Sequence, residues 1–241
     1  MAIGERLSVV IPSWREGPRL LDTLRAARTA LGDCEAVVVA SEETDDVREV
    51  ACAEGAQWIE SPRPCRGLQL RMGAGAARGE HVLFLHADSR LPADAGRYVR
   101  SALAMPGVSG GAFRLRFDRS HVVLSVLGWL SALAIPTAFL GDQCLFCTKQ
   151  AYTAAGGFSD QPLFEDVDMA RRLARVGRLV RLPQTVTTSA RRFTEVGPFR
   201  QVLTNAFLMG AFHAGVSPDR LHARYTRHAT GRLPVGLRTP K

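Results

Sequence analysis

This chain contains no known nucleic-acid-binding motif, although its positive charge would favour the binding of a polyanion. The 241 residues carry a formal net charge of +8, and the sequence pI is about 9.9. Such a charge favours anionic partners: nucleic acid, an anionic membrane surface or phosphorylated substrates. The basic residues are mostly arginines, with short clusters such as Arg191-Arg192 and no long basic run. Because zinc-finger and RNP-type motifs are also absent, we expect no nucleic-acid partner.

Cysteine is scarce, and its pattern excludes a disulfide framework. The five cysteines are an odd number in a long chain that shows no signal-peptide pattern. They therefore predict a reducing, cytoplasmic setting. Cys144 and Cys147 have the spacing of half a zinc site, but no second pair completes it. We expect both to be structural.

Long uncharged runs are also rare, and the one at residues 122–141 approaches the length of a membrane span. Its serines and Gly128 lower its hydrophobicity, and Pro136 would break a helix near its end. We expect a largely buried or interface-lying helix that does not span a membrane. Residues 199–214 predict a second apolar helix. Docking on a lipid surface at the inner face of a membrane stays open for both, as does a homodimer.

What the chain does contain is an alternation of short apolar strands and amphipathic helices. Hydrophobic residues make up 46% of it, enough for a substantial core. Strands are predicted at residues 7–11, 35–40, 57–60 and 82–85, and helices at 18–30, 44–54, 66–78 and 93–103. This order predicts an α/β fold with βαβ units and a mostly parallel sheet.

The pattern changes after residue 105. A half-exposed strand is predicted at 110–117, and further strands at 143–148, 179–182 and 185–188. Helices are predicted at 122–141, 165–176 and 199–214, with a helix end and a Gly-Gly stop at 152–157. We expect residues 1–105 to form a nucleotide-binding half, 106–225 a mixed half that completes one site, and 226–241 a basic mobile tail.

Asp88 is the first candidate functional residue, because it follows a buried strand within HVLFLHADSRLP, residues 81–92. The carboxyl ends of strands in an open α/β sheet are where ligands bind. A carboxylate there suits Mg²⁺ or Mn²⁺ holding a phosphate. The alternative is an Asp-Ser turn or helix cap.

Two further acidic positions lie where loops meet strands or helices. Glu16 follows the first strand, and the run Glu165-Asp166-Val167-Asp168 begins a helix. Acids stabilise a helix start, which explains one or two of these carboxylates. The preceding GGFSDQPLF loop could present one of them to a ligand, where it would act as a general base toward a hydroxyl.

Five segments follow one another along nearly the whole chain: LSVVIPSWRE (7–16), LHADSRLP (85–92), GDQCLF (141–146), GGFSDQPLFEDVDMARRLARVG (156–177) and SARRF (189–193). In this order they resemble family 2 glycosyltransferases of the GT-A fold. The combination of RGLQL at 66–70, LHADS and GDQ resembles a bacterial subgroup associated with radical-SAM and selenium-domain gene clusters. The resemblance implies one GT-A-like domain over residues 1–225, with a Rossmann-type central sheet and helices on both faces.

The resemblance also implies a catalytic centre. His86-Ala87-Asp88 stands in the place of the family's DXD motif, with Asp88 as the ligand of Mn²⁺ or Mg²⁺. Asp166 corresponds to the aspartate of the ED motif, the general base for inversion.

A nucleotide-sugar pocket is implied around this centre. Its first wall would lie beside the first strand, Arg66 and Gln69 would contact the nucleotide or its phosphates, and a late basic-aromatic motif would close over the donor. The first wall comprises Pro12, Ser13, Trp14 and Glu16, and the late motif comprises Arg191, Arg192 and Phe193.

Two positions depart from the family pattern. The aspartate that ends the second strand and pairs with the base is replaced by Ala40. Either Ser41, Glu42 or Glu43 serves instead, or recognition of the base is loose. The first DXD position is His86, a tolerable ligand for a metal or a ribose.

The leading hypothesis is an inverting, metal-dependent glycosyltransferase of the hexosyltransferase type. It would move a sugar from a nucleoside-diphosphate donor to a hydroxyl acceptor, soluble or lipid-linked. A nucleotidyltransferase would want a Gly- and Lys-rich loop after the first strand, and PSWREGPRL has no lysine and one glycine. The third hypothesis is a non-catalytic sugar-nucleotide or membrane-surface binding protein that keeps the fold.

Overall fold

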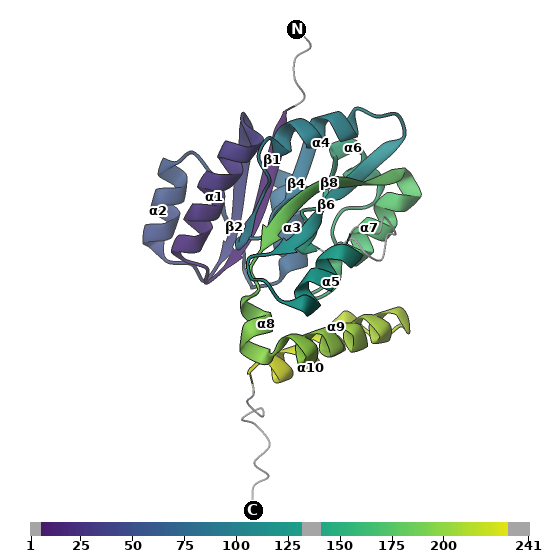
Figure 1. Ribbon diagram of the computed structural model, residues 1–241. Coiled ribbons are helices and arrows are strands. Elements are labelled where there is room, and N and C mark those ends of the chain that lie inside the picture. Colours follow the sequence, from purple (N-terminus) through teal and green to yellow (C-terminus); the bar gives the residue numbers. More distant parts are fainter. Residues whose placement is uncertain (1–5, 132–140, 231–241) are drawn as a thin grey trace, which may run out of the picture.

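One eight-stranded sheet runs through the computed structural model, which describes residues 6–131 and 141–230 (Figure 1). The strand order is β3-β2-β1-β4-β7-β6-β8-β5. The strands are β1 (Leu7–Trp14), β2 (Cys34–Ser41), β3 (Gln57–Glu60), β4 (His81–Phe84), β5 (Ser89–Arg90), β6 (Val108–Phe117), β7 (Phe146–Thr148) and β8 (Arg178–Thr188).

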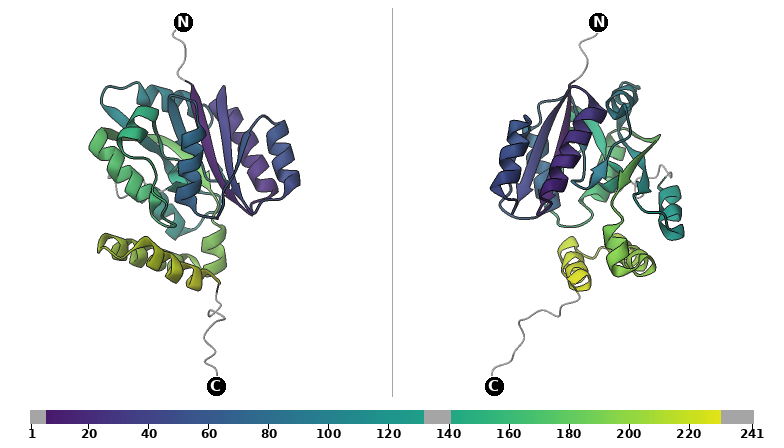
Figure 2. Two further views of the ribbon diagram at one scale, coloured as in Figure 1. Left: turned by 180° about the vertical axis from the view of Figure 1, so that it is seen from behind. Right: turned by 60° about the vertical axis from the view of Figure 1, so that its left-hand side comes forward.

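Helices cover both faces of this sheet, and a separate group lies beyond one end of it (Figures 1 and 2). The helices are α1 (Pro18–Leu31), α2 (Asp45–Ala53), α3 (Arg66–Ala76), α4 (Ala95–Leu103), α5 (Val122–Leu130), the 3₁₀ turn η2 (Gly141–Gln143), α6 (Lys149–Ala154), α7 (Glu165–Val176), α8 (Arg191–Val196), α9 (Pro198–His213) and α10 (Pro218–Thr230).

The first half of the sheet is parallel, as its sequence predicts. β1 pairs in parallel with β2 and β4, and β2 pairs in parallel with β3. Successive side chains of β1 point to opposite faces: Val9 and Ile11 join one apolar cluster, and Val10 joins the other. Burial on both faces explains why these strands are continuous apolar runs. The predicted α/β class with a mostly parallel central sheet is confirmed.

The second half mixes strand directions. β7 runs antiparallel to both β4 and β6, whereas β6 and β8 are parallel. β6 is buried from Val108 to Phe113, whereas Arg114 and Arg116 are exposed and alternate with the buried Leu115. The predicted half-exposure therefore holds only for the second half of the strand. β7 begins at Phe146 rather than 143, because η2 occupies the preceding residues.

The two strands predicted at 179–182 and 185–188 form one strand, β8. Pro183 suggests a break because it lacks an N–H group to donate. The register slips at this point, so that Phe113 pairs with Leu182 and Arg114 with Thr185. A bulge thus takes up Pro183 and Gln184 and lets the strand continue.

The uncharged helix predicted at 122–141 ends at Leu130 in the structure. Ser131 marks the end, because its hydroxyl donates to the Gly128 carbonyl oxygen (2.5 Å) and accepts from the Leu115 amide of β6 (2.8 Å). Residues 132–140 lie outside the described part of the chain. Among the described residues, no helix combines the length and apolar character that a membrane crossing requires.

Helices α8, α9 and α10 form a layer below the carboxyl ends of the parallel strands (Figures 1 and 2). α9 matches the predicted helix at 199–214 within one residue at each end. α10 was not predicted, and it extends to Thr230. The first five residues of the predicted tail therefore belong to a helix, and residues 231–241 lie outside the described part.

All five cysteines are free, and Cys144 and Cys147 are buried. Burial raises the pKa of the Cys147 thiol to about 12 and that of Cys144 well above its ordinary value. Both thiols therefore stay protonated and unreactive near neutral pH, which agrees with a structural role.

A glycine in α3 allows a close approach of the loop that precedes α7. A Cβ on Gly67 would lie 2.2 Å from the Ser159 carbonyl oxygen and 2.7 Å from the Gln161 carbonyl oxygen. Both obstacles are backbone atoms, so neither can rotate away. The first turn of α3, which carries Arg66, is thereby held against this loop.

We expect Gly67→Ala to lower the free energy of unfolding by about 1–3 kcal/mol, because the backbone would have to shift. Gly75→Ala in the same helix is the control, since a Cβ there meets nothing within 4 Å. It should stabilise α3 by about 0.5–1 kcal/mol. Urea denaturation measures both, and equal effects at the two positions would contradict this packing.

Candidate active site

The loop after β1 is held by one carboxylate from the loop after β2. Glu43 Oε1 accepts hydrogen bonds from the Ser13 hydroxyl (2.7 Å) and the Glu16 amide (2.7 Å), and its Oε2 accepts one from the Gly17 amide (3.0 Å). Both carboxylate oxygens of Glu43 thus accept hydrogen bonds from the loop after β1. The structure gives it a positioning role, although the sequence had made it a candidate for base recognition.

Gln69 joins the carboxyl ends of β1 and β2. Its Nε2 donates to the Ser13 carbonyl oxygen (2.7 Å) and the Val39 carbonyl oxygen (3.0 Å). The residue is 3% exposed. Because both amide hydrogens bind backbone, Gln69 fixes the two strand ends, and its predicted nucleotide contact has no donor left on Nε2.

The other residues predicted to line the pocket are spread along this strand edge. Pro12, Ser13, Ser41 and Ala87 are buried, His86 is half-buried, and Trp14 is 50% exposed. Ala87 accepts a hydrogen bond from the Thr23 hydroxyl through its carbonyl oxygen (2.7 Å). Glu42 is exposed and pairs with Arg15 (2.5 Å).

The late basic motif reaches this edge from α8. Arg191 Nη2 lies 3.7 Å from Glu16 Oε1, and Arg19 lies 4.0 Å from the other oxygen of the same carboxylate. Two arginines thus face Glu16, and the contact with Arg191 links α8 to the loop after β1. Phe193 packs edge-on against Phe117, with ring centroids 5.2 Å apart. The side chain of Arg192 lies outside the described part of the structure.

Arg66 is the cationic centre of the site. Its Nη1 lies 3.6 Å from Glu165 Oε1. Burial alone would lower the pKa of Arg66, but the nearby Glu165, Asp166 and Asp88 raise it above its ordinary value, with a smaller contribution from Tyr225 of α10. The guanidinium that α3 carries therefore lies where the loop after β4 and the start of α7 meet.

Asp142 is a fourth acidic residue of this cluster, and the sequence analysis missed it. Burial raises the pKa of Asp142 to about 7, with further contributions from Asp166 and Asp88, while Arg66 opposes the shift. Its Oδ1 is buried without a hydrogen-bond partner among the described residues. The signal was available, because Asp142 is the acid of the GDQ segment.

The 3₁₀ turn that carries Asp142 is fixed by its neighbour. Gln143 is 2% exposed, and its Oε1 accepts a short hydrogen bond from Arg181 of β8. Arg181 also donates to the Phe113 carbonyl oxygen of β6 (2.9 Å). The turn that carries Asp142 is thus hydrogen-bonded to the sheet through Arg181.

α7 places two carboxylates at its first turn. Phe164 caps the helix in the left-handed conformation (φ 62°). Glu165 is 2% exposed, and burial together with Asp166 raises its pKa to about 7, against the opposing effect of Arg66. Asp166 is half-buried, and its Oδ1 accepts the Val167 amide hydrogen (2.7 Å).

Asp88 and Asp166 belong to the same group of charged side chains. Both act electrostatically on Arg66 and on Asp142, so the sheet does not separate them. A metal ligand and a general base that serve one reaction would have to lie close together in this way. The chemical roles of the two residues stay predictions.

The carboxylates of Asp88 and Asp142 suit a divalent cation if the phosphate oxygens of a bound diphosphate supply further ligands. The described residues include no group of three or more His, Cys, Asp or Glu side chains arranged to hold a metal ion. Mg²⁺-type sites commonly use one or two carboxylates together with substrate phosphates and water. Asp88, with the unpartnered oxygen of Asp142 nearby, fits such a shared site.

The comparisons with known proteins agree with this site. Residues 8–121 match the sequence model of the family described as Glycosyl transferase family 2. This segment includes β1 to β6, Arg66 and Asp88, so the similarity to the glycosyltransferase family covers the half of the chain that was predicted to bind a nucleotide. No curated protein matches the chain.

Solved structures of glycosyltransferases share the fold. The mannosyltransferase PcManGT from Pyrobaculum calidifontis, in complex with GDP-Man and Mn²⁺, has a TM-score of 0.64 at 21% identity, over 92% of this chain and 70% of that chain. Glucosyl-3-phosphoglycerate synthase from Mycobacterium tuberculosis, in complex with Mn²⁺, UDP and glucosyl-3-phosphoglycerate, has a TM-score of 0.57 at 20% identity, over 86% and 80%. The GT-A fold is therefore confirmed.

The raised pKa of Glu165 predicts a pH-dependent stability. The folded protein holds a proton on Glu165 up to about pH 7, whereas the ordinary value is 4.5. Its contribution to the free energy of unfolding is therefore complete below pH 4.5 and is lost as the pH rises through 7. Glu165→Gln removes this ionisation. In the absence of metal, the free energy of unfolding of the variant relative to that of wild type should therefore rise by about 3 kcal/mol between pH 4 and pH 8.

Urea denaturation of both proteins in EDTA across this pH range is the measurement. Glu49→Gln, on the exposed side of α2, is the control and should run parallel to wild type. A constant difference between Glu165→Gln and wild type at every pH would contradict the burial of an ionisable Glu165.

Proposed function

We propose that this protein is an inverting, metal-dependent glycosyltransferase that uses a nucleoside-diphosphate sugar donor. The observation that carries the proposal is the convergence of Asp88, Asp142, Glu165 and Asp166 on Arg66 at the carboxyl edge of a GT-A sheet. The Mn²⁺ and nucleotides in the complexes named above support a metal and a nucleotide sugar. Mn²⁺ is the first candidate, and Mg²⁺ is the second.

The proposed reaction is a single displacement at the anomeric carbon. The acceptor hydroxyl oxygen forms the new bond while the bond to the diphosphate oxygen breaks. Asp166 takes the proton of the hydroxyl. The departing nucleoside diphosphate gains negative charge, which Arg66 and Arg191 stabilise. A divalent cation held by Asp88 supplies further charge neutralisation when it is bound.

The acceptor contributes a hydroxyl, and its wider chemistry stays a prediction. The predicted lipid-linked acceptor, the homodimer and the membership of the radical-SAM and selenium-domain-associated subgroup belong to this proposal as hypotheses. The nucleotidyltransferase alternative is less well supported, because the structures compared above are glycosyltransferases and the β1–α1 loop has no lysine.

Asp88→Asn should weaken metal-stimulated nucleotide binding by roughly tenfold or more, because a neutral amide is a poorer ligand for Mn²⁺. Calorimetric titration of UDP and GDP, with and without Mn²⁺, measures this effect. Asp22→Asn on the exposed face of α1 is the control. Undiminished binding that still requires the metal would remove Asp88 from the metal site.

Asp166→Asn should lower kcat by roughly two orders of magnitude or more while nucleotide affinity survives, because the variant loses only the base. Release of nucleoside diphosphate from the donor, with water as the acceptor, is a measurement that needs no identified acceptor. Asp142→Asn is the informative comparison. A larger loss of kcat for Asp142→Asn, with Asp166→Asn near wild type, would transfer the role of base to Asp142.

A further inference from the structure

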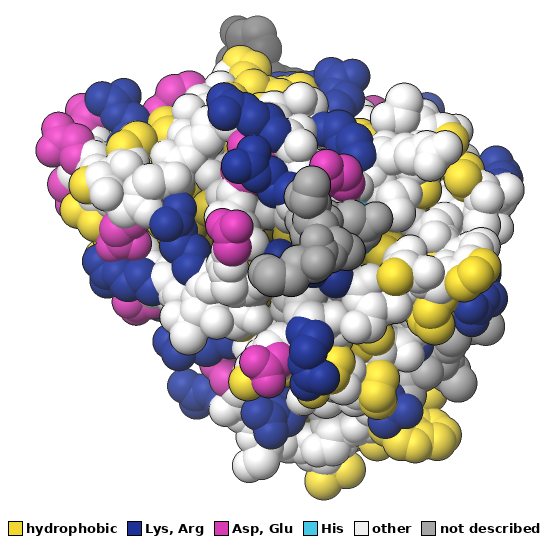
Figure 3. All heavy atoms as spheres, turned by 90° about the horizontal axis from the view of Figure 1, so that it is seen from above, with side chains coloured by type: hydrophobic (Ala, Val, Ile, Leu, Met, Phe, Trp, Pro, Cys, Tyr) yellow, Lys and Arg dark blue, Asp and Glu magenta, His cyan; other side chains and the backbone are white. Residues whose placement is uncertain are grey.

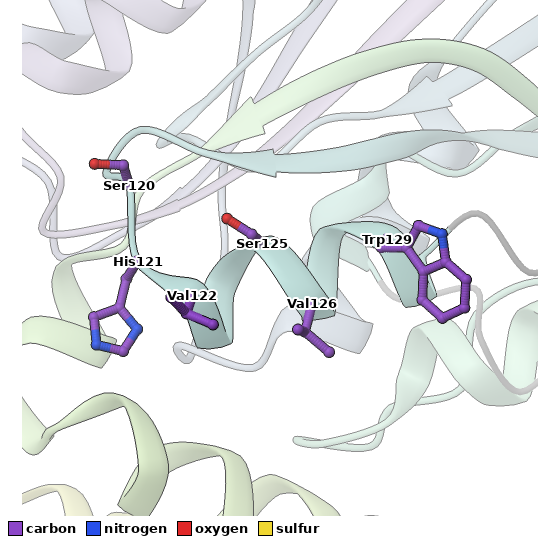
Figure 4. A pocket seen from close by; sticks show the side chains of 6 residues that line it. All are labelled: Ser120, His121, Val122, Ser125, Val126 and Trp129. Atoms are coloured by element: carbon purple, nitrogen blue, oxygen red, sulfur yellow. The ribbon is translucent and has the colours of Figure 1, made fainter.

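Helix α5 exposes an apolar row to solvent. Val122 is 79% exposed, Val126 50% and Trp129 73%, and their spacing places them on one face of the helix. Figure 4 shows Val122 and Val126 on the side of α5 that faces away from β6. The three residues line an open groove of about 590 Å³, together with Ser120, His121 and Ser125.

Helix α9 carries a second apolar row. Phe199 is 73% exposed, Leu203 69% and Phe207 52%, and each follows the previous one by four residues. α9 contacts α5, so both rows lie at the same end of the molecule. We refer to the six residues of the two rows as the α5/α9 surface.

Half of the net positive charge of the protein belongs to the described segment that carries α9. Residues 191–230 contain six arginines and two acidic residues, so they carry four of the eight net positive charges. Arg200, Arg220 and Arg224 are exposed, and the Arg224 guanidinium lies 4.6 Å from the ring centroid of Phe207. In contrast, Figure 3 shows Lys and Arg interspersed with Asp and Glu at the opposite end.

We propose that the α5/α9 surface docks on an anionic lipid bilayer, with the apolar rows at the acyl boundary and the arginines at the headgroups. Exposed apolar side chains flanked by arginines are the composition that binds such an interface. Trp129 suits the same position, because tryptophan concentrates where a bilayer meets water. The inference goes beyond the proposed reaction and does not depend on it.

The charge distribution favours a bilayer over a second copy of this chain. In a twofold dimer the same surface would face itself, and two segments that each carry a net positive charge would be brought together. Like charges at close range are unfavourable, whereas anionic lipid headgroups complement them. A partner of opposite charge therefore fits the surface better than its own copy.

The docked surface would lie near the candidate active site. Phe212 of α9 stacks on Phe164, the residue that caps α7, with ring centroids 4.9 Å apart. Tyr225 of α10 acts on Arg66, and Arg191 of α8 pairs with Glu16. A bilayer bound to this layer would thus place lipid headgroups close to the loops that carry Asp166.

Flotation of the full chain with phosphatidylglycerol vesicles tests the proposal, and phosphatidylcholine vesicles are the lipid control. We expect flotation with the anionic vesicles at low salt, loss of flotation at high salt, and none with phosphatidylcholine. Protein that stays at the bottom of the gradient with anionic vesicles at low salt overturns the proposal.

Two variants separate apolar contact from charge. Leu203→Glu/Phe207→Glu and the charge-neutral Leu203→Ala/Phe207→Ala should each weaken vesicle binding, the first by at least about tenfold. Val50→Glu on α2, where Val50 is 37% exposed, introduces the same kind of charge elsewhere and should bind nearly as wild type. Melting temperatures close to wild type show that the variants are folded. Equal binding by all variants overturns the assignment of the surface.

Two further readouts identify the occupant. In a Trp14→Phe/Trp58→Phe variant, brominated anionic lipids should quench the fluorescence of Trp129. The oligomeric state is measured by sedimentation without lipid. A dimer that Leu203→Glu/Phe207→Glu dissociates, combined with no quenching and no flotation, assigns the surface to a second copy and overturns the proposal.

Discussion

Four carboxylates around one guanidinium are the constraint on which the site depends. Asp88, Asp142, Glu165 and Asp166 all interact with Arg66. Burial, together with repulsion from the neighbouring carboxylates, raises the pKa values of Glu165 and Asp142 to about 7, and the single positive charge of Arg66 does not cancel this effect. An anionic diphosphate would be repelled by such a site unless a cation came with it. This charge imbalance is the physical reason to expect a divalent metal in the proposed reaction.

The scaffold holds these charges in place through backbone contacts. Gln69 fixes the ends of β1 and β2, and Glu43 fixes the loop that follows β1. Gly67 lets α3 approach the loop before α7 closely enough for Arg66 to reach Glu165. Each contact joins segments that are distant in the sequence. Carboxylates that would otherwise repel one another are thereby kept close together.

The sequence predicts the parts of this architecture that depend on local pattern. The buried parallel strands and α7 follow from apolar runs and an acidic helix start, and Asp88 follows from its place after β4. Features that depend on tertiary contacts were missed: the bulge that joins β8, the end of α5 at Ser131, and α10. Asp142 was also missed: the GDQ segment marks its position in the sequence, but its burial beside Asp88 and Asp166 depends on tertiary contacts. Glu43 and Gln69 looked like ligand-binding residues, yet their hydrogen bonds go to the protein.

The central claim is that this carboxyl edge binds a nucleoside-diphosphate sugar together with a divalent metal. The most direct measurement is the melting temperature of the full chain with UDP-, GDP-, CMP- and dTDP-sugars, each with and without Mn²⁺, since a ligand that binds only the folded state raises it. The account predicts a clear rise for one nucleoside-diphosphate sugar in the presence of Mn²⁺, and a much smaller rise without the metal. No rise with any sugar nucleotide in Mn²⁺, or a larger rise with a nucleoside triphosphate, would contradict it.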